Sequence, residues 1–232
     1  MQRLLSLIRR ADTDFGLIRD GERVAVGVSG GKDSLTLLCA LARYRAFATH
    51  PFTLTAVTID MGLKPFDLSG IAALCASLEV PYIVERTHIG DMVRNSPHPC
   101  SLCARLRKGT LTRVLNENGI TALALGHHRD DAIETFMLSL LKEGRVHTFE
   151  PRALLSRSGI MQIRPMIYAE EVEIAKLSKR LDLPVVPSPC PVDGETARAD
   201  IRRQIESMEA HYPDVRDKLM SAVRGLWSAP GS

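Results

Sequence analysis

Six residues near the start of the chain, Ser29-Gly-Gly-Lys-Asp-Ser34, have the composition of a loop that binds phosphate. The two glycines allow an anion to approach backbone N–H groups, both serine hydroxyls can donate to phosphate oxygens, and Lys32 adds a positive charge. We expect Ser34 to cap the helix that follows. The segment is not a Walker A loop, because that motif has glycine where Val26 stands and Ser or Thr where Asp33 stands.

Asp33 is the unusual member of this loop, since a carboxylate repels a neighbouring triphosphate. Two roles would explain it. It either binds Mg²⁺ or accepts backbone N–H bonds that hold the loop in shape. The sequence leaves both roles open.

A second segment, ALGHHRDDAIETFMLSLL at 124–141, carries two histidines and two aspartates. Gly126 is placed at the end of a strand, where the chain can pass close to a ligand. Asp130 and Asp131 open a helix, and a carboxylate there is either a cap or a metal ligand. Taken alone, His127 and His128 are more typical of packing or hydrogen bonding than of metal binding.

The chain has five cysteines, an odd number that argues against a framework of disulfides. Cys100 and Cys103 form a CxxC at the start of a basic helix, where thiolates are favoured, and Cys190 lies much later. Three hypotheses compete: a structural zinc with His98 as an added ligand, a redox or persulfide pair, and an iron–sulfur cluster held by three cysteines. The remaining cysteines, Cys39 and Cys75, lie in apolar helical segments and are expected in the core.

The composition is that of a soluble globular protein: 232 residues, 45% hydrophobic, 25% charged, net charge +3. No apolar run approaches the length of a membrane helix, and residues 1–15 read as an amphipathic helix rather than a signal peptide. We therefore expect a cytoplasmic protein that does not enter membranes. Basic residues gather at 103–113, 145–152 and 198–204.

Strands and helices alternate along the first two thirds of the chain, which predicts a doubly wound α/β fold with a parallel sheet. The expected strands are 24–28, 52–59, 82–85 and 120–125, and the expected helices are 34–44, 68–78, 101–118 and 130–141. Two short strands around Ser158-Gly159, a helix at 170–180, a short strand at 183–187 and helices at 197–210 and 213–226 should follow. We divide the chain into an N-terminal helix (1–20), an α/β domain (21–185) and a C-terminal segment with helices (186–232).

The motif SGGKDS after a strand resembles the signature of the PP-loop ATP pyrophosphatases. Further motifs, PCSLCARLRKG, LGHHRDDAIET, IRPM and PCPVDGETAR, make nearly the whole chain similar to the tRNA 2-thiocytidine synthetase family. The resemblance implies a fold like that of the adenine nucleotide α-hydrolases and cleavage of ATP between its α- and β-phosphates. AMP would then pass to the C2 carbonyl oxygen of a pyrimidine, most simply a cytidine in the tRNA anticodon loop, and sulfur would replace that oxygen.

The same resemblance assigns roles to residues. Residues 29–34 would hold the phosphates with Mg²⁺, Lys32 would neutralise the leaving pyrophosphate, and Asp130 or Asp131 would lie near the adenylated oxygen. Cys100, Cys103 and Cys190 would carry a [4Fe–4S] cluster. We expect these three cysteines to converge at the carboxyl ends of the strands, near the α-phosphate of ATP. Asp60 and Met61, after the second strand, should border the adenosine.

The partners expected are tRNA, a sulfur donor (a cysteine desulfurase or free sulfide) and, by resemblance, a second copy of the chain in a homodimer. Apolar residues exposed on the N-terminal helix would be compatible with that dimer. Arg164 is either a phosphate or RNA contact or a surface residue of an edge strand. The expected donors to RNA phosphates are Arg105, Arg107, Lys108, Arg202 and Arg203.

Three other functions stay open on the sequence alone. The chain could be a PP-loop ligase acting on a small carboxylate or amide, and such an enzyme would work without RNA. It could be an iron–sulfur or zinc protein that binds RNA and has lost catalysis. It could also carry out another sulfur reaction on this scaffold, such as sulfur removal or the thiolation of uridine.

Overall fold

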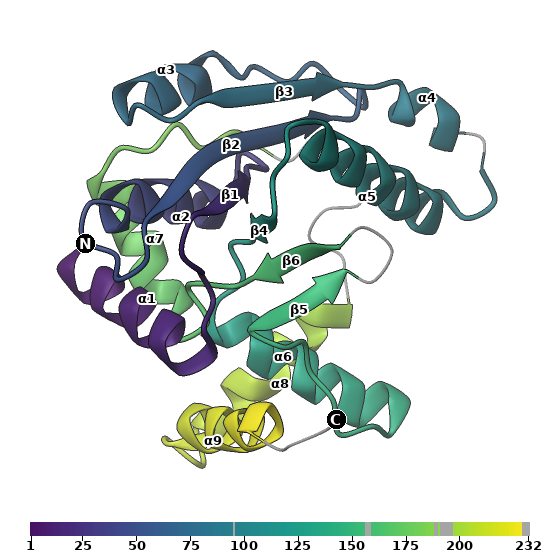
Figure 1. Ribbon diagram of the computed structural model, residues 1–232. Coiled ribbons are helices and arrows are strands. Elements are labelled where there is room, and N and C mark those ends of the chain that lie inside the picture. The colour runs from purple at the N-terminus through teal and green to yellow at the C-terminus, as the bar shows by residue number, and fades with distance from the viewer. Residues whose placement is uncertain (95, 156–158, 188–189, 191–196, 229–232) are drawn as a thin grey trace.

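The structure is a computed structural model that describes residues 1–94, 96–155, 159–187, 190 and 197–228 (Figure 1). At its centre is a six-stranded sheet flanked by helices. Within the described residues, no helix combines the length and apolar character needed to cross a membrane.

The sheet has the strand order β3-β2-β1-β4-β6-β5. Five strands run parallel, and β5 pairs antiparallel with β6 as a hairpin at one edge. The predicted α/β fold with a largely parallel sheet is therefore confirmed. The strands are β1 (Glu22–Gly27), β2 (Phe52–Asp60), β3 (Tyr82–Arg86), β4 (Ala122–Ala124), β5 (Arg152–Leu155) and β6 (Ile160–Ile163).

The strand order reverses at β1. The chain runs from β1 outward to β2 and β3 and then crosses back to β4 on the other side of β1. The loops that leave β1 and β4 therefore both lie where the order reverses, and open α/β sheets bind ligands beside the carboxyl ends of the strands at such a point. The SGGKDS motif follows β1, and the GHHRDD motif follows β4.

Helices cover both faces of the sheet. On one face the core joins the sheet to α1, α2, α3 and α7, and on the other face α5 packs on a smaller apolar cluster (Figure 1). Each strand supplies both faces by alternation: Val24 and Val26 point to the first, and Ala25 points to the second. The helices are α1 (Gln2–Phe15), α2 (Lys32–Tyr44), α3 (Ser69–Ser77), α4 (Ile89–Arg94), α5 (Pro99–Glu117), α6 (Arg129–Leu138), α7 (Glu171–Arg180), α8 (Ala197–Glu209) and α9 (Val215–Ser228).

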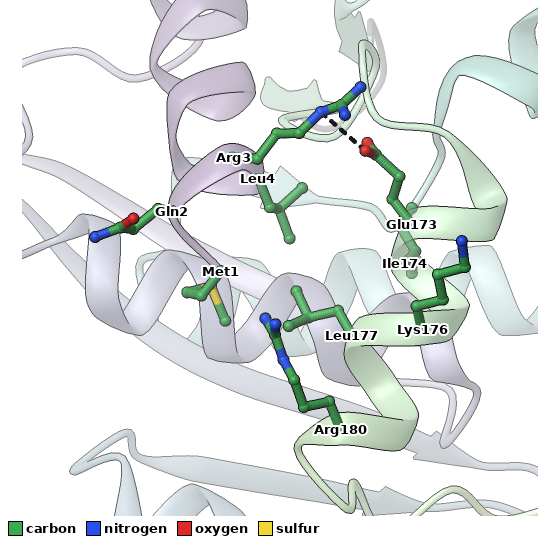
Figure 2. Close-up of a pocket in the computed structure, with 9 residues that line it drawn as sticks. All are labelled: Met1, Gln2, Arg3, Leu4, Glu173, Ile174, Lys176, Leu177 and Arg180. Atoms are coloured by element: carbon green, nitrogen blue, oxygen red, sulfur yellow. Dashed lines mark ion pairs between the residues drawn. The ribbon is translucent and has the colours of Figure 1, made fainter.

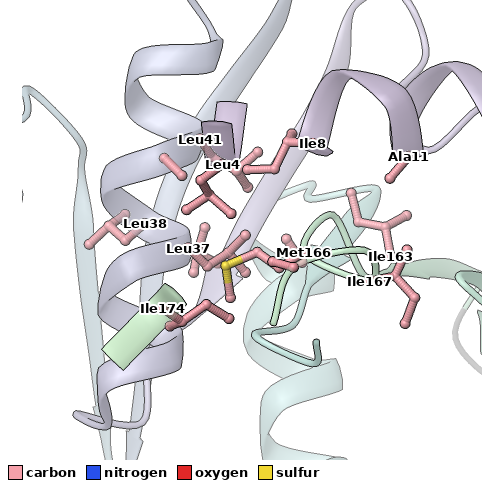
Figure 3. Close-up of a cluster of buried hydrophobic side chains, with 14 of the residues drawn as sticks. Leu4, Ile8, Ala11, Leu37, Leu38, Leu41, Ile163, Met166, Ile167 and Ile174 are labelled. Atoms are coloured by element: carbon pink, nitrogen blue, oxygen red, sulfur yellow. The ribbon is translucent and has the colours of Figure 1, made fainter. Parts of the chain in front are cut away.

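The packing of α1, α2 and α7 fixes the helix that follows the SGGKDS motif. Leu37 and Leu41 of α2 meet Leu4 and Ile8 of α1, with Ile174 of α7 beside them (Figure 3). All five side chains are buried. Burying apolar side chains of this size contributes about 1.5–3 kcal/mol each, so the core holds the body of α2 in place behind its first turn.

Two expectations, one about the N-terminal helix and one about residues 183–187, are wrong. The apolar side chains of α1 pack inward, and among the described residues none of the strongly exposed large hydrophobics lies on α1. The helix therefore offers no exposed apolar face for a dimer. Residues 183–187 do not form a strand: Val186 donates one backbone bond to Gly30 (3.0 Å), and prolines at 184 and 187 lack the N–H that a ladder requires.

The other predicted elements are confirmed to within a few residues, and two elements were missed. Helix α4 is a short helix of six residues that the sequence pattern did not indicate. The predicted helix 130–141 is α-helical as far as Leu138, in α6, and continues as the π-helix η1 (Ser139–Glu143). Gly144, with a φ of 64°, ends it. The turn at Ser158-Gly159 lies partly outside the described residues.

Candidate functional site

The loop between β1 and α2 turns at Gly30, whose φ is +85°. A Cβ there would lie 3.2 Å from the ring of Phe66 and 3.4 Å from Val186, so both the backbone angle and the space favour glycine. The helix begins after Gly31, which is its N-cap in an extended conformation. Backbone N–H groups at the start of α2 therefore point out of the loop, as an anion site requires.

Ser34 does not cap α2, contrary to prediction. It lies in the first turn, where its hydroxyl donates to the carbonyl of Gly31 (2.9 Å) and accepts from the backbone N–H of Ser29 (3.2 Å). Its side chain is buried, and the hydroxyls of Ser29 and Ser34 lie 3.3 Å apart. Both serines thus bond the loop to itself, and Ser29 is the one nearer the solvent.

Lys32 lies between two carboxylates. Its Nζ is 2.9 Å from Glu171 and 3.1 Å from Asp33. Burial works to lower the pKa of Lys32, but the hydrogen bond to Glu171 and the charge of Asp33 outweigh it, so the pKa is raised. Among the described residues, Asp33 therefore pairs with the ammonium of Lys32 and accepts no backbone N–H bond.

Gly126, directly after β4, packs against the phosphate loop itself. A Cβ at this position would lie 3.0 Å from the backbone carbon of Asp33 and 3.1 Å from the nitrogen of Ser34. The close approach that we predicted toward a ligand is thus an approach to the loop that would hold the ligand. This contact locks the ends of β1 and β4 together.

The histidine–aspartate segment opens α6 with a capping box. His128 is the N-cap, and its backbone N–H donates to Asp131 (3.0 Å), whose other carboxylate oxygen meets Arg198 at 3.1 Å. The buried carboxylate of Asp130 accepts from the backbone N–H of Glu171 (2.8 Å) and from Arg216 (2.8 Å). Both aspartates therefore have structural bonds in this structure.

Two arginines of α8 reach this cluster. Arg202 donates to Glu134 (2.8 Å) and lies 3.3 Å from Glu171, while Arg198 meets Asp131. Glu134 is almost fully buried, and burial raises its pKa against the opposing effect of Arg202. A continuous chain of charges therefore runs from the phosphate loop through α7 to α8 and α6.

The buried Arg164 pairs with the half-buried His127, which lies between β4 and α6. Arg164 donates from Nε to Nδ1 of His127 (3.1 Å) and from its other nitrogens to Gln162 and the carbonyl of Glu150, and both side chains pack on Phe149. Arg164 is only 6% exposed. The expectation of a surface arginine is wrong, and its guanidinium is committed to internal partners in this structure.

The carboxyl end of β2 brings a thiol to the crevice. Asp60 ends the strand, and its carboxylate accepts from the backbone N–H of Gly62 (3.0 Å). Met61 follows, with its Sδ 3.5 Å from the Sγ of Cys103. The CxxC on the first turn of α5 is thereby placed at the same edge of the sheet as the phosphate loop.

Cys100 is exposed, Cys103 and Cys190 are half-buried, and Cys39 and Cys75 are buried in the core as predicted. None of the five forms a disulfide. Cys190 comes four residues after Val186, which bonds to Gly30, so its Cα lies within about 14 Å of Val186. In the described parts of the chain, no group of three His, Cys, Asp or Glu side chains is arranged to hold a metal ion. The predicted convergence of the three cysteines thus stays a prediction.

The basic residues expected to bind RNA differ in their surroundings. Arg105, Arg107 and Lys108 of α5 are exposed on the CxxC helix. Arg203 pairs with Asp200, and Arg202 is engaged within the charged chain. The outer face of α5, next to Cys100 and Cys103, is thus a basic surface.

A cavity of about 670 Å³ lies elsewhere, between the start of α1 and α7 (Figure 2). Arg180 lines it at the end of α7, about 14 Å along the helix from Glu171. None of the residues predicted for the site is among its lining residues. The residues predicted for the site lie instead at the carboxyl ends of β1, β2 and β4.

Sequence reasoning missed Glu171, Glu134 and Arg198. Glu171 lies in an acidic first turn, which by itself indicates only a favourable interaction with the helix dipole. Glu134 lies in the LGHHRDDAIET motif and Arg198 in the PCPVDGETAR motif. The two side chains come together only because α8 packs against α6. Nothing local in the sequence could have supplied these contacts.

A family model described as a PP-loop domain matches residues 2–209. The tRNA-cytidine(32) 2-sulfurtransferase of Geobacter sulfurreducens is 38% identical over 228 residues, covering 96% of this chain and 89% of that protein. The protein of the same name from Pelobacter propionicus is 36% identical over 231 residues, covering 97% and 86%. The chain belongs to this family of PP-loop proteins. The family predicted from the motifs is therefore confirmed.

Solved structures confirm the PP-loop fold. The U34-tRNA thiolase NcsA from Methanococcus maripaludis, solved with its [4Fe-4S] cluster, aligns with a TM-score of 0.77 at 22% identity, covering 99% of this chain and 79% of that chain. The NH3-dependent NAD synthetase from Campylobacter jejuni aligns with a TM-score of 0.52 at 14% identity, covering 97% and 90%. At these identities the PP-loop fold is what is shared.

Gly126→Ala should impair ATP binding, because the new methyl group would push the backbone at Asp33 and Ser34 out of position. Overpacking of this kind costs about 1–3 kcal/mol, so we expect binding to weaken about tenfold in calorimetry. Gly109→Ala is the control, since a Cβ there meets no atom within 4 Å and lies inside α5. Equal affinities for the two variants would show that Gly126 does not shape the loop.

The His127–Arg164 pair predicts a dependence of stability on pH. Burial and the neighbouring Arg164 lower the pKa of His127 from 6.5 to about 4. Because the unfolded chain takes up the proton first, the stabilisation is complete above pH 6.5 and is lost as the pH falls toward 4. Between pH 7 and pH 5 the wild type should lose about 2 kcal/mol more free energy of unfolding than His127→Gln, measured with urea. Parallel pH profiles would contradict the assignment.

Proposed function

We propose that the chain is an ATP-dependent tRNA sulfurtransferase that replaces the C2 oxygen of a cytidine with sulfur. The observation that carries the proposal is the SGGKDS loop at the strand reversal, with the CxxC thiols at the same edge of the sheet. Relatives that span nearly the whole chain bear the name tRNA-cytidine(32) 2-sulfurtransferase. The substrate is accordingly a cytidine of tRNA, and the enzyme is a transferase that consumes ATP.

The phosphate loop would hold the end of ATP that leaves as pyrophosphate. Backbone N–H groups at the start of α2, and the ammonium of Lys32 once it turns from Glu171 or Asp33 toward the phosphates, can neutralise the charge that develops there. Mg²⁺ would accompany the triphosphate, with Asp33 as the nearest carboxylate of the loop. Asp60 and Met61, at the end of the neighbouring strand, would border the adenosine.

The reaction requires two bond exchanges at one carbon. The C2 carbonyl oxygen of the base attacks the α-phosphorus of ATP, and the bond to the β-phosphate breaks, releasing pyrophosphate. Sulfide then bonds to C2, and the C2–O bond breaks so that AMP leaves with the oxygen. Neither step needs an oxidant. Asp130 or Asp131 would stay near the adenylated oxygen, at the start of α6.

A [4Fe–4S] cluster would supply the sulfur chemistry by binding sulfide at an iron that has no cysteine ligand. The residues present fit such a group in kind, because thiolates are the ligands that the cluster takes and the chain has three cysteines outside its core. Cys100 and Cys103 share the first turn of α5, Cys103 contacts Met61, and Cys190 follows the segment that bonds to Gly30. We propose these three as its ligands. The sulfide would come from a cysteine desulfurase or from the free pool.

The RNA would lie along the outer face of α5. Arg105, Arg107 and Lys108 are exposed there, next to the CxxC, and can contact phosphates of the anticodon loop. A splayed base of a single-stranded loop can enter a crevice that a paired base cannot reach. This face leads the base toward both the thiols and the phosphate loop.

The test is nucleoside analysis by mass spectrometry of tRNA treated anaerobically with the protein, ATP and sulfide. We expect 2-thiocytidine with the wild type, a loss of at least about 100-fold with Lys32→Ala, and a loss as great with Cys103→Ser. Cys39→Ala is the control, because Cys39 is buried in the core away from the crevice.

Iron content measured on the same samples separates the roles of these residues. Lys32→Ala should keep its iron, and Cys103→Ser should lose it. A colourless wild type with one tightly bound zinc would refute the cluster. Formation of 2-thiouridine, or unchanged thiolation by Lys32→Ala, would refute the proposed reaction.

A further inference from the structure

The carboxylate of Glu171 joins two cations that belong to different parts of the site. One oxygen lies 2.9 Å from Nζ of Lys32 in the phosphate loop, and the other lies 3.3 Å from Nη2 of Arg202 in α8. The side chain is 28% exposed. Burial works to raise the pKa of Glu171, but the bond from Lys32 and the two positive charges outweigh it, so the pKa is lowered. The group is therefore a carboxylate anion held between two cations.

The fold holds Glu171 in this place. Its backbone N–H donates to the buried carboxylate of Asp130 at 2.8 Å, which fixes the first turn of α7 against the start of α6. Helix α7 also packs along α2, the helix that begins with Lys32. The packing of the core thus sets the distance between the backbone of Glu171 in α7 and that of Lys32 in α2. The carboxylate of Glu171 is therefore held within reach of the Lys32 ammonium.

A bound phosphate must compete with this carboxylate. Lys32 is the loop's own cation, and its ammonium is shared between Glu171 and Asp33. To neutralise a pyrophosphate, Nζ has to turn outward toward the loop and give up at least one of these contacts. Asp33 is the adjacent residue and moves with the loop, whereas Glu171 belongs to another helix.

We propose that Glu171 is a positioning residue for Lys32, holding its ammonium when no nucleotide is bound and releasing it to the phosphates of ATP. The released carboxylate is not left without a partner, because Arg202 already lies beside its second oxygen. Arg202 is itself held by the buried Glu134 at 2.8 Å. ATP would therefore shift the pairing of Glu171 from the phosphate loop to α8.

This inference rests on the proposed binding of ATP and makes a specific claim about affinity. Glu171→Gln keeps the size and hydrogen-bonding capacity of the side chain and removes its charge. Because Lys32 then has one competitor fewer, ATP should bind roughly three- to tenfold more tightly in calorimetry. Unchanged or weaker binding would overturn the proposal.

Glu173→Gln is a matched control. Glu173 lies on the same helix, its side chain is also 28% exposed, and it pairs at 2.8 Å with an arginine, Arg3 of α1 (Figure 2). The loss of one acidic charge from α7 is thus the same in both variants. Equal tightening in both would show a general effect of charge and would overturn the specific role of Glu171.

A second comparison tests whether Glu171 acts through Lys32. In the background of Lys32→Met, the change Glu171→Gln should leave the affinity for ATP unaltered. A tightening that persists without the ammonium would overturn the proposal, because it would mean that Glu171 repels the nucleotide directly.

All of these measurements use purified protein and ATP without tRNA. A wild type that binds ATP but thiolates no tRNA would defeat the proposed function alone. A wild type that thiolates tRNA and shows no tightening in Glu171→Gln would defeat this inference alone. A wild type that binds no ATP would defeat both.

Discussion

The contact between Gly126 and the backbone of Asp33 and Ser34 is the constraint on which the site depends. It exists because the strand order reverses at β1, so that the segments leaving β1 and β4 meet at one edge of the sheet. A residue with a side chain would hold these two segments apart. With glycine, the phosphate loop rests directly on the start of the second motif. The helices α2 and α6 can then begin side by side, and their polar first turns face the same crevice.

Around this junction the charged side chains form a connected set of ion pairs. Carboxylates of α2, α6 and α7 alternate with a lysine and the arginines of α8, so that neither sign accumulates. Partly buried charges are stabilising only when they are paired, which explains why the carboxylates of Asp131 and Glu134 meet arginines from a distant helix. The same pairing engages the ammonium of Lys32 with two carboxylates. An incoming polyphosphate must therefore rearrange ion pairs and does not enter an open positive pocket.

Much of the fold follows from patterns that are local in the sequence. The apolar strands, the helix periods and the glycine at the loop predict a parallel α/β sheet with SGGKDS at its carboxyl edge, and the structure agrees. What failed depended on tertiary contacts. Ser34 was expected as a cap, yet the loop folds back so that Gly31 holds that position and the serine bonds inward. Residues 183–187 have the composition of a strand, but their prolines leave only a single bond to Gly30. One of the two expectations for Arg164 placed it at the surface, because nothing local shows that His127 and Phe149 enclose it.

The most direct test of the account is the fate of the oxygen that sulfur replaces. With tRNA carrying oxygen-18 at C2 of the target cytidine, the account predicts that AMP gains the label, that unlabelled pyrophosphate appears, and that one AMP is formed for each base thiolated. Label in water, or ADP and phosphate as the tRNA-dependent products, would contradict the claim that this loop holds pyrophosphate while AMP passes to the base.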